Sequence, residues 1–202
     1  MESANPDHDL LRLPRRVWIG EDEGQIALLI DGVVQSVVVG DGPLGPGYWP
    51  LMLPDVRPRA ALILGLGGGT LVHLLTRRFP GIRITGVEHE PAVIRIARGA
   101  FGLDTPALDI VEADAFVFVA EAAGPYDYVA VDLWADGAIP IAIFQKPFLR
   151  RVRELLTPGG VAAINFFKDR RAASRLRRIE AMFPRVEVRQ SRENFVVLCR
   201  PR

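Results

Sequence analysis

Residues 60–70 read AALILGLGGGT, a short apolar run that leads directly into a cluster of glycines. An apolar run of this length predicts a buried strand, and the following LVHLLTRRF (71–79) has the leucine spacing of a helix. A glycine-rich turn between a strand and a helix lets the main chain approach a ligand closely. The candidate binding residues of this turn are Gly65, Leu66, Gly67, Gly68 and Gly69.

From this stretch toward the C-terminus, strand-like and helix-like runs alternate five times with short connections. Such alternation predicts an α/β fold: a parallel sheet with helices on both faces and right-handed crossovers. The run VEVRQSRENFVVLCR (186–200) predicts a final antiparallel hairpin, which a class I methyltransferase-type Rossmann sheet has. The first expected strand starts at residue 60, and the other strands are expected over 83–88, 108–114, 126–134 and 161–167. A turn over 157–160 is expected to precede the last strand. The expected helices cover 71–79, 91–98, 115–123, 146–156 and 170–183.

Toward the N-terminus, IALLI (26–30) and VVQSVVV (33–39) flank an Asp-Gly pair, which predicts a β-hairpin. VWI (17–19) is expected to add a third strand. GDGPLGPGYWP (40–50) predicts a loop because of its glycines and prolines, and residues 1–14 show no periodicity and are expected to form a loose arm. We therefore expect an arm and small β-hairpin unit over 1–55, and a Rossmann-like cofactor-binding domain over 56–202.

The composition narrows the class of protein. The 202 residues are 49% hydrophobic and 24% charged, as in an ordinary folded domain, and no apolar run approaches the length of a membrane span. The first residues show acids before any apolar run, which argues against a secretory signal. The 25 basic residues are balanced by 24 acidic ones, so the arginine clusters are interpreted as solvated helix faces and not as a nucleic-acid surface. One cysteine fits a cytoplasmic protein.

Acidic residues end three of the expected strands. Glu88 follows Gly67 by 21 residues, the spacing at which a carboxylate accepts both ribose hydroxyls and disfavours a 2′-phosphate. Asp114 with the small Ala115 suits an adenine ring, although Asp114 is also a natural helix N-cap. Asp132 is positioned to deprotonate an amine or hold a cation, and its alternative role is to orient a loop. Ligands bind at the carboxyl edge of such sheets, where all three are expected.

The remaining polar residues give weaker indications. Asp136 lies in the loop after Asp132, and His89 is expected to pack over an adenosine. His8, His73 and His89 are too scattered in the sequence for a recognisable metal site. The sequence contains no GxSxG motif and no P-loop lysine, so neither a serine hydrolase nor a P-loop NTPase is indicated.

Several segments, taken together and in this order, resemble the spermidine/spermine synthase family, which has the class I S-adenosylmethionine-dependent methyltransferase fold. The resemblance implies transfer of an aminopropyl group from decarboxylated S-adenosylmethionine to a diamine. It also implies that Glu88 binds the ribose, that Asp114 and Ala115 contact the adenine, and that Asp132 is the general base. The matching segments are LIDGVVQ (29–35), the glycines 67–69, VEHEPAVI (87–94), EADA (112–115), YDYVAVD (126–132) and LTPGG (156–160).

The sequence departs from the family on the acceptor side. Thr70 replaces the aspartate that grips the amino end of the donor, and Trp49 replaces the polar residue after the family's tyrosine, here Tyr48. The glutamate that follows is absent, and the family's cofactor-contacting glutamine has no counterpart near Arg15. The substrate-side candidates are Tyr48, Trp49, Thr70, Trp134, Asp136 and Pro140, of which Asp136 and Pro140 match the family's second aspartate and later proline after a one-residue insertion.

The sequence therefore predicts a spermidine synthase-like transferase that uses S-adenosylmethionine or its decarboxylated form, releases S-adenosylhomocysteine or methylthioadenosine, and needs no metal. The acceptor is expected to be a small molecule, with a polyamine-related amine as one candidate, and nucleic acid and membranes are not expected partners. We expect a homodimer. A methyltransferase and a non-catalytic adenosyl-nucleoside-binding module remain alternatives, and an NAD-dependent oxidoreductase is disfavoured because no hydride-transfer residues are evident.

Overall fold

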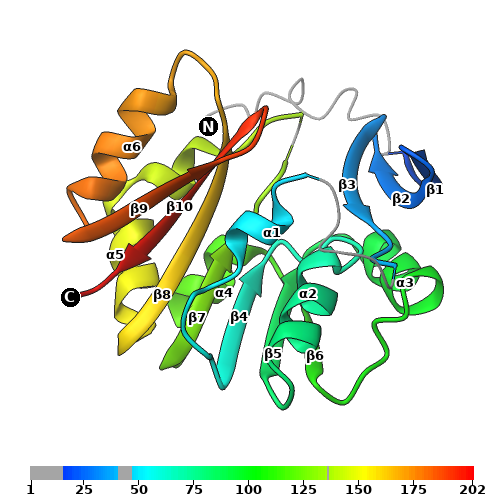
Figure 1. Ribbon diagram of the computed structural model, residues 1–202, viewed down its shortest axis with the longest axis horizontal. Coiled ribbons are helices and arrows are strands. Elements are labelled where there is room, and N and C mark those ends of the chain that lie inside the picture. Colours follow the sequence, from blue (N-terminus) through cyan, green and yellow to red (C-terminus); the bar gives the residue numbers. More distant parts are fainter. Residues whose placement is uncertain (1–15, 41–46, 136) are drawn as a thin grey trace, which may run out of the picture.

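The computed structural model describes residues 16–40, 47–135 and 137–202, and its centre is a seven-stranded sheet (Figure 1). The strand order is β6-β5-β4-β7-β8-β10-β9; β4 to β8 are parallel and β10 is antiparallel to both of its neighbours. This confirms the predicted parallel sheet with a terminal hairpin. The strands are β4 (Ala60–Leu64), β5 (Arg83–Glu88), β6 (Leu108–Glu112), β7 (Tyr126–Val131), β8 (Leu156–Phe167), β9 (Arg185–Gln190) and β10 (Asn194–Arg200).

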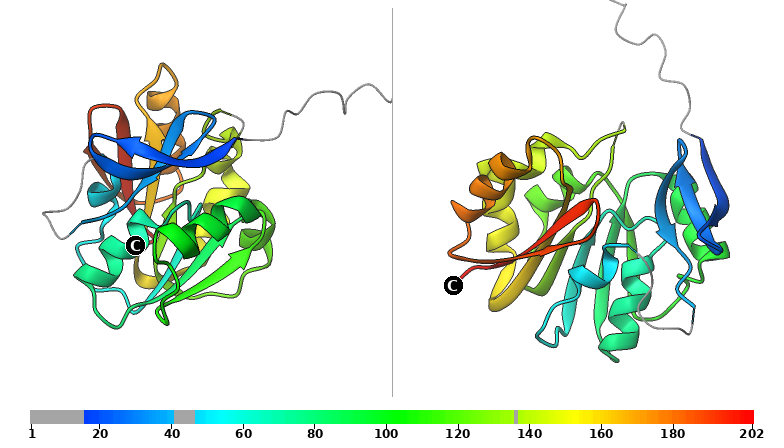
Figure 2. Two further views of the ribbon diagram at one scale, coloured as in Figure 1. Left: turned by 90° about the vertical axis from the view of Figure 1, so that its right-hand side faces the viewer. Right: turned by 45° about the horizontal axis from the view of Figure 1, so that its top comes forward.

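Helices cover both faces of this sheet because its strands alternate two apolar faces. Along β4, Ala61 and Ile63 join a core with α2, whereas Leu62 and Leu64 join the opposite core with α4 and α5. Figure 2 shows these two layers of helices on either side of the strands. The helices are α2 (Thr70–Arg78), α3 (Pro91–Ala100), α4 (Ala115–Glu121), α5 (Lys146–Glu154) and α6 (Ala172–Glu180), with the 3₁₀ helix η2 (Ile141–Phe144) before α5.

A separate three-stranded antiparallel sheet lies near α3, at the opposite end of the molecule from α6 (Figures 1 and 2). It consists of β1 (Val17–Asp22), β2 (Gln25–Ile30) and β3 (Val33–Val37), which confirms the predicted hairpin and third strand. Asp31 and Gly32 have φ values of 50° and 83°, as the turn of a tight hairpin requires. Leu28 and Ile30 pack against Val93 and Phe101, so this sheet is attached through a small core of its own.

Two local predictions were wrong. The loop predicted over 40–50 ends earlier, because the short helix α1 (Trp49–Met52) begins at Trp49, and Pro50 is tolerated in its first turn. The turn predicted over 157–160 is part of β8, which begins at Leu156 and pairs with β7 across an irregularity between Tyr126 and Tyr128. Hydrogen bonding to a neighbouring strand therefore overrides the local turn preference of Pro-Gly-Gly.

The predicted arm over 1–14 lies outside the described residues. The division of the chain at residue 55 stays a prediction; Trp49 and Met52 pack in the same core as Leu71 and Leu75 of α2. Within residues 16–40, 47–135 and 137–202, no helix has both the length and the apolar character needed to cross a membrane.

Candidate active site

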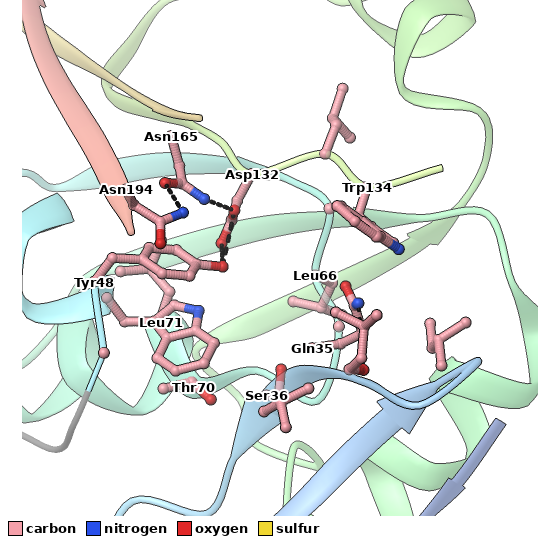
Figure 3. A pocket seen from close by; sticks show the side chains of 18 of the residues that line it. Gln35, Ser36, Tyr48, Leu66, Thr70, Leu71, Asp132, Trp134, Asn165 and Asn194 are labelled. Atoms are coloured by element: carbon pink, nitrogen blue, oxygen red, sulfur yellow. Dashed lines mark hydrogen bonds between the residues drawn. The ribbon is translucent and has the colours of Figure 1, made fainter. Parts of the chain in front are cut away.

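A cavity of about 670 Å³ opens at the carboxyl ends of β4, β5 and β7, with β3 on its other side (Figure 3). β4 lies between β5 and β7, so the strand order reverses here, and ligands of open α/β sheets bind at such a point. The volume is in the range of small-molecule sites. The structure brings together at this cavity many of the residues predicted from sequence: Tyr48, Trp49, Gly65, Leu66, Gly67, Thr70, Glu88, His89, Ala115, Asp132 and Trp134.

The glycine turn is held by its own hydrogen bonds. The Gly67 N–H donates to Glu88 Oε2 at 3.1 Å, and the Gly68 N–H donates to Ser36 Oγ of β3 at 2.7 Å. Gly65 has φ +86°, and a Cβ there would collide with the main-chain oxygen of Asp132. Gly68 and Gly69 do not appear in the lining of the cavity, and a side chain at Gly69 would collide with Leu103. Only the first part of the turn therefore faces a ligand directly.

Glu88 ends β5 with only 8% of its surface exposed. Its Oε1 accepts main-chain hydrogen bonds from His89 at 2.9 Å and Glu90 at 3.1 Å, and the His89 Nδ1 lies 3.3 Å away. Burial by itself would raise the pKa of Glu88, but the hydrogen bonds from His89, Glu90 and Gly67 hold that pKa below its ordinary value. Glu88 is therefore a fixed, ionised hydrogen-bond acceptor at neutral pH.

The expected adenine-side residues divide into two groups. Asp114 accepts hydrogen bonds from the main-chain N–H groups of Phe116 at 2.8 Å and Val117 at 3.0 Å, so its side chain caps α4, as the sequence had left open. Asp114 is not part of the cavity lining, whereas Ala115 is. His89 lies on the lining with 46% of its side chain exposed. A ligand would meet the small Ala115 and the rim residue His89 rather than the Asp114 carboxylate.

Asp132 follows the end of β7 and is held by side chains from two other segments (Figure 3). The Tyr48 hydroxyl lies 3.1 Å from Oδ1 and 3.0 Å from Oδ2, and the Asn165 Nδ2 donates to Oδ1 at 2.8 Å. Burial raises the pKa of Asp132 from 3.8 to about 6, against the opposing hydrogen bonds of Asn165, Tyr48 and Trp49. A carboxylate with this pKa can both accept and release a proton near neutrality.

Helix α1 fixes Tyr48 and Trp49 at the cavity. Arg189 Nη1 donates to the carbonyl of Leu51 at 3.1 Å and to that of Leu53 at 2.8 Å, and the Tyr128 hydroxyl donates to the carbonyl of Met52 at 2.7 Å. These bonds satisfy the carbonyls at the end of a helix only four residues long. The Tyr48 and Trp49 rings stack with centroids 4.6 Å apart. Burial and then the Asp132 charge raise the pKa of Tyr48, so Tyr48 acts as a neutral donor.

Of the other residues predicted on the acceptor side, some line the cavity and others do not. Thr70 lines the cavity, but its hydroxyl donates to the Val37 carbonyl at 2.8 Å and accepts from the Val37 N–H at 2.9 Å. Trp134 lines the cavity and packs edge-on against Phe167. Pro140 precedes η2 and is absent from the lining. Asp136 lies outside the described residues.

Three residues of the site were missed from the sequence: Ser36, Asn165 and Asn194. Ser36 and Asn165 interrupt apolar strands, VVQSVVV and VAAINFF, and both are buried. A polar residue inside such a run indicates a buried hydrogen bond. The sequence offered this signal but could not identify the partner. Across the described ranges, no three His, Cys, Asp or Glu side chains are grouped to hold a metal.

Comparisons with known proteins place the chain in a family. The family model described as "Spermine/spermidine synthase domain" matches residues 49–169. The chain is 36% identical over 137 residues to a probable polyamine aminopropyl transferase of Bifidobacterium longum, covering 65% of this chain but only 30% of that protein.

Two solved structures share the fold. A probable spermidine synthase from Corynebacterium glutamicum is 22% identical, with a TM-score of 0.78 and coverage of 94% of this chain and 78% of that one. Human methyltransferase-like protein 13, in complex with SAH, is 28% identical, with a TM-score of 0.65 and coverage of 76% of each chain. The family model spans more than half of the length of this chain, so the chain belongs to the spermine/spermidine synthase domain family.

Proposed function

We propose that this chain is a spermidine synthase-like transferase, which binds an S-adenosyl donor and transfers its alkyl group to the nitrogen of a small amine. The observation that carries this proposal is the Asp132 carboxylate, which lies on the same cavity as Glu88 with a pKa of about 6. Groups of this kind, perturbed in pKa and placed in a cavity at the switch point of the sheet, are typical of catalytic sites.

The residues present fit an adenosyl donor. Glu88 is ionised and nearly buried at the end of β5, where it would accept hydrogen bonds from ribose hydroxyls. Ala115 leaves room on the lining for a flat ring, and the glycines 65 and 67 leave the adjacent main chain uncovered by side chains. Glu88, the first part of the glycine turn and Ala115 are therefore the proposed donor-binding residues.

Asp132 would supply the proton chemistry. A bound donor provides an electrophilic carbon next to its sulfonium sulfur. Attack by a neutral amine nitrogen would form a C–N bond as the C–S bond breaks. The alkylated nitrogen would then be a positively charged ammonium that must lose a proton. Asp132 is mostly ionised at pH 7 because that pH lies above its pKa of about 6, so its carboxylate can accept this proton. Tyr48 and Asn165 hold the carboxylate in place during the transfer.

Methyl transfer is a second candidate, which Thr70 favours. Both hydrogen-bonding functions of its hydroxyl are used by the Val37 main chain, and the residue carries no charge to grip the amino end of an aminopropyl donor. The similarity to a human methyltransferase-like protein points in the same direction. Without a carboxylate at residue 70, that position does not repel the carboxylate of S-adenosylmethionine.

Calorimetric titration with S-adenosylmethionine, its decarboxylated form and methylthioadenosine tests the proposal and separates the candidates. We expect all three to bind, since they share the adenosine half, and the order of the first two identifies the donor. Glu88→Gln is the control for ribose recognition. Lack of binding by all three compounds would contradict the proposal. Binding without turnover on any amine or methyl acceptor would favour a non-catalytic nucleoside-binding module.

A further inference from the structure

Two buried asparagines extend the hydrogen bonding of Asp132 into the terminal hairpin of the sheet (Figure 3). Asn194 Nδ2 donates to Asn165 Oδ1 at 3.0 Å, and Asn165 Nδ2 donates to Asp132 Oδ1 at 2.8 Å. Each asparagine is only 6% exposed. Burial of two primary amides is costly unless they are paired, so this chain of hydrogen bonds calls for an explanation.

The direction of the chain follows from the chemistry of an amide, which has a donor end and an acceptor end. Because Asn194 donates to the oxygen of Asn165, the nitrogen of Asn165 must face Asp132. If Asn165 turned over, its carbonyl would face a carboxylate and repel it. The antiparallel register of β8 and β10, which pairs Asn194 with Phe167 and Val196 with Asn165, holds the two side chains at this spacing.

The chain of amides also makes the two oxygens of Asp132 unequal. Oδ1 accepts from Asn165, which does not reach Oδ2; the single Tyr48 hydroxyl proton lies within reach of both oxygens, and the Trp49 side chain also hydrogen-bonds to the carboxylate. The chain of amides therefore occupies a lone pair of Oδ1 and none of Oδ2. A rotation of the carboxylate would exchange the two oxygens, and the donation from Asn165 opposes that rotation.

We propose that Asn194 is a positioning residue that acts through Asn165 to orient the Asp132 carboxylate, so that Oδ2 is the oxygen that takes the proton from the acceptor. This inference rests on the proposed function, because it assigns a task to the same site. Neither asparagine needs to touch the reacting atoms for this role.

Other titratable groups near Asp132 would not account for a change in its pKa in a variant at residue 194. Tyr48 faces it from the segment before α1, and Tyr128 of β7 responds to its charge. Burial and then the Asp132 charge raise the pKa of both phenols, so both stay neutral. Arg189 acts on Tyr128 in the opposite direction. These groups are identical in the wild-type protein and in a variant at residue 194. A variant at residue 194 also leaves unchanged the other charged residues of the lining, which are Asp22, Glu23, Glu88, His89, Glu90, Arg192 and Glu193.

The test compares Asn194→Leu, which keeps the branching of the side chain but cannot donate, with wild type. Ser191→Ala is the matched control, since Ser191 Oγ accepts from the Asn194 N–H at 3.1 Å and its loss loosens the same turn without touching the amides. The carboxyl carbon of Asp132 is titrated by ¹³C NMR, with its signal assigned by Asp132→Asn. In parallel, kcat and KM are measured against pH.

With Asn194→Leu, we expect the pKa of Asp132 to rise on the order of one pH unit, because a donor to the charged form is weakened. The acidic limb of kcat should move upward by the same amount and kcat should fall about tenfold, with KM for the donor unchanged. Ser191→Ala should leave the Asp132 pKa where it is. If Asn194→Leu does not fold, Asn194→Ala removes the same donor without adding bulk.

An unchanged Asp132 titration in a folded Asn194 variant would overturn the inference, and a lower melting temperature with no change in the pH profile would assign Asn194 to stability alone. The NMR titration does not require turnover. If no acceptor is ever found, the proposed function fails while the shift in the Asp132 pKa still decides whether Asn194 acts on Asp132.

Discussion

At the scale of single residues, two carboxylates on one cavity are held in opposite electrostatic states. Main-chain and His89 hydrogen bonds lower the pKa of Glu88 in spite of its burial, whereas burial raises the pKa of Asp132 to about 6 despite hydrogen bonds from Asn165 and Tyr48. Environments that push the pKa values of neighbouring acids apart assign them different tasks. A permanently charged Glu88 suits binding, and Asp132 suits proton transfer.

Replacing Glu88 by alanine should weaken the binding of adenosyl compounds on the order of 100-fold, since two charge-assisted hydrogen bonds to a ribose would be lost and partly replaced by water. Calorimetry with methylthioadenosine measures the effect. The melting temperature must be followed too, because Glu88 also accepts from the Gly67 N–H. Unchanged affinity in the folded variant would remove Glu88 from the donor site.

Asp132→Asn should leave donor affinity nearly intact and lower turnover by about 10² to 10⁴, the usual contribution of a general base. An amide keeps the shape and still accepts a hydrogen bond, but it cannot take the proton. Kinetics with the identified acceptor, beside calorimetry of the donor, check this. Joint loss of thermal stability and affinity would instead mark Asp132 as a loop anchor, and full turnover would exclude it as the base.

The raised pKa of Asp132 also predicts a pH-dependent stability difference. A folded-state pKa above the unfolded value of 3.8 means that the stabilising contribution is complete below that pH and is lost as pH rises through about 6. Asp132→Asn has no such loss. Its free energy of unfolding relative to wild type should increase by about 2 kcal/mol between about pH 4 and about pH 8. Thermal melts of both proteins across this range give the difference; a constant difference would contradict the shifted pKa.

At the scale of elements, two hydroxyls join the small N-terminal sheet to the carboxyl edge of the large one. Ser36 of β3 accepts from the Gly68 N–H, and Thr70 at the start of α2 binds both main-chain groups of Val37. The glycine turn and the N-terminus of α2 are therefore fixed against β3. This arrangement places β3 as one wall of the cavity.

Thr70→Val tests whether residue 70 joins the elements or grips the donor. The change keeps the shape but leaves the buried N–H and carbonyl of Val37 without their partner, at a cost of about 2 kcal/mol or more and a fall in melting temperature on the order of 5 °C. Affinity for S-adenosylmethionine should hardly change. Thr70→Ser, which keeps the hydroxyl, is the matched control. Reduced donor affinity at unchanged stability would show that Thr70 contacts the donor tail instead.

At the scale of the whole molecule, the cavity exists only because distant parts of the chain meet. Its lining includes β3, the segment before α1, the ends of β4, β5 and β7, and the turn between β9 and β10. On the acceptor side that the family resemblance implies, residue 70 is a buried threonine in place of an aspartate, and residue 49 is a buried tryptophan in place of a polar residue. A diamine binds best where several carboxylates share a dry site.

Spermidine synthesis should accordingly be weak. Incubation of the protein with decarboxylated S-adenosylmethionine and putrescine, followed by chromatography, should yield little methylthioadenosine. An Asp132→Asn sample gives the background of spontaneous breakdown. Turnover of about 1 per second or faster, which is in the ordinary enzyme range, would show that the threonine and tryptophan do not impair the acceptor site.

The sequence determined much of this protein because strands and helices follow local periodicity. It predicted β5 with its observed bounds, the Asp-Gly hairpin, the glycine turn after β4, and Glu88 and Asp132 at one edge of the sheet. It misjudged residues 157–160, where pairing with a neighbouring strand overrides the turn preference of Pro-Gly-Gly. A local pattern cannot report such long-range pairing.

What only the tertiary structure decided is which polar atoms meet. Tyr48 and Asp132 are 84 residues apart, Asn165 and Asn194 are 29 apart, and Thr70 reaches Val37 across 33 residues. Burial raises the pKa of Asp132 and its contacts with Tyr48 and Asn165 oppose that rise, while the Val37 main chain occupies the hydroxyl of Thr70. The physical reason is that residue type fixes what a side chain can donate or accept, whereas the fold fixes the distance and burial on which hydrogen bonding and charge depend.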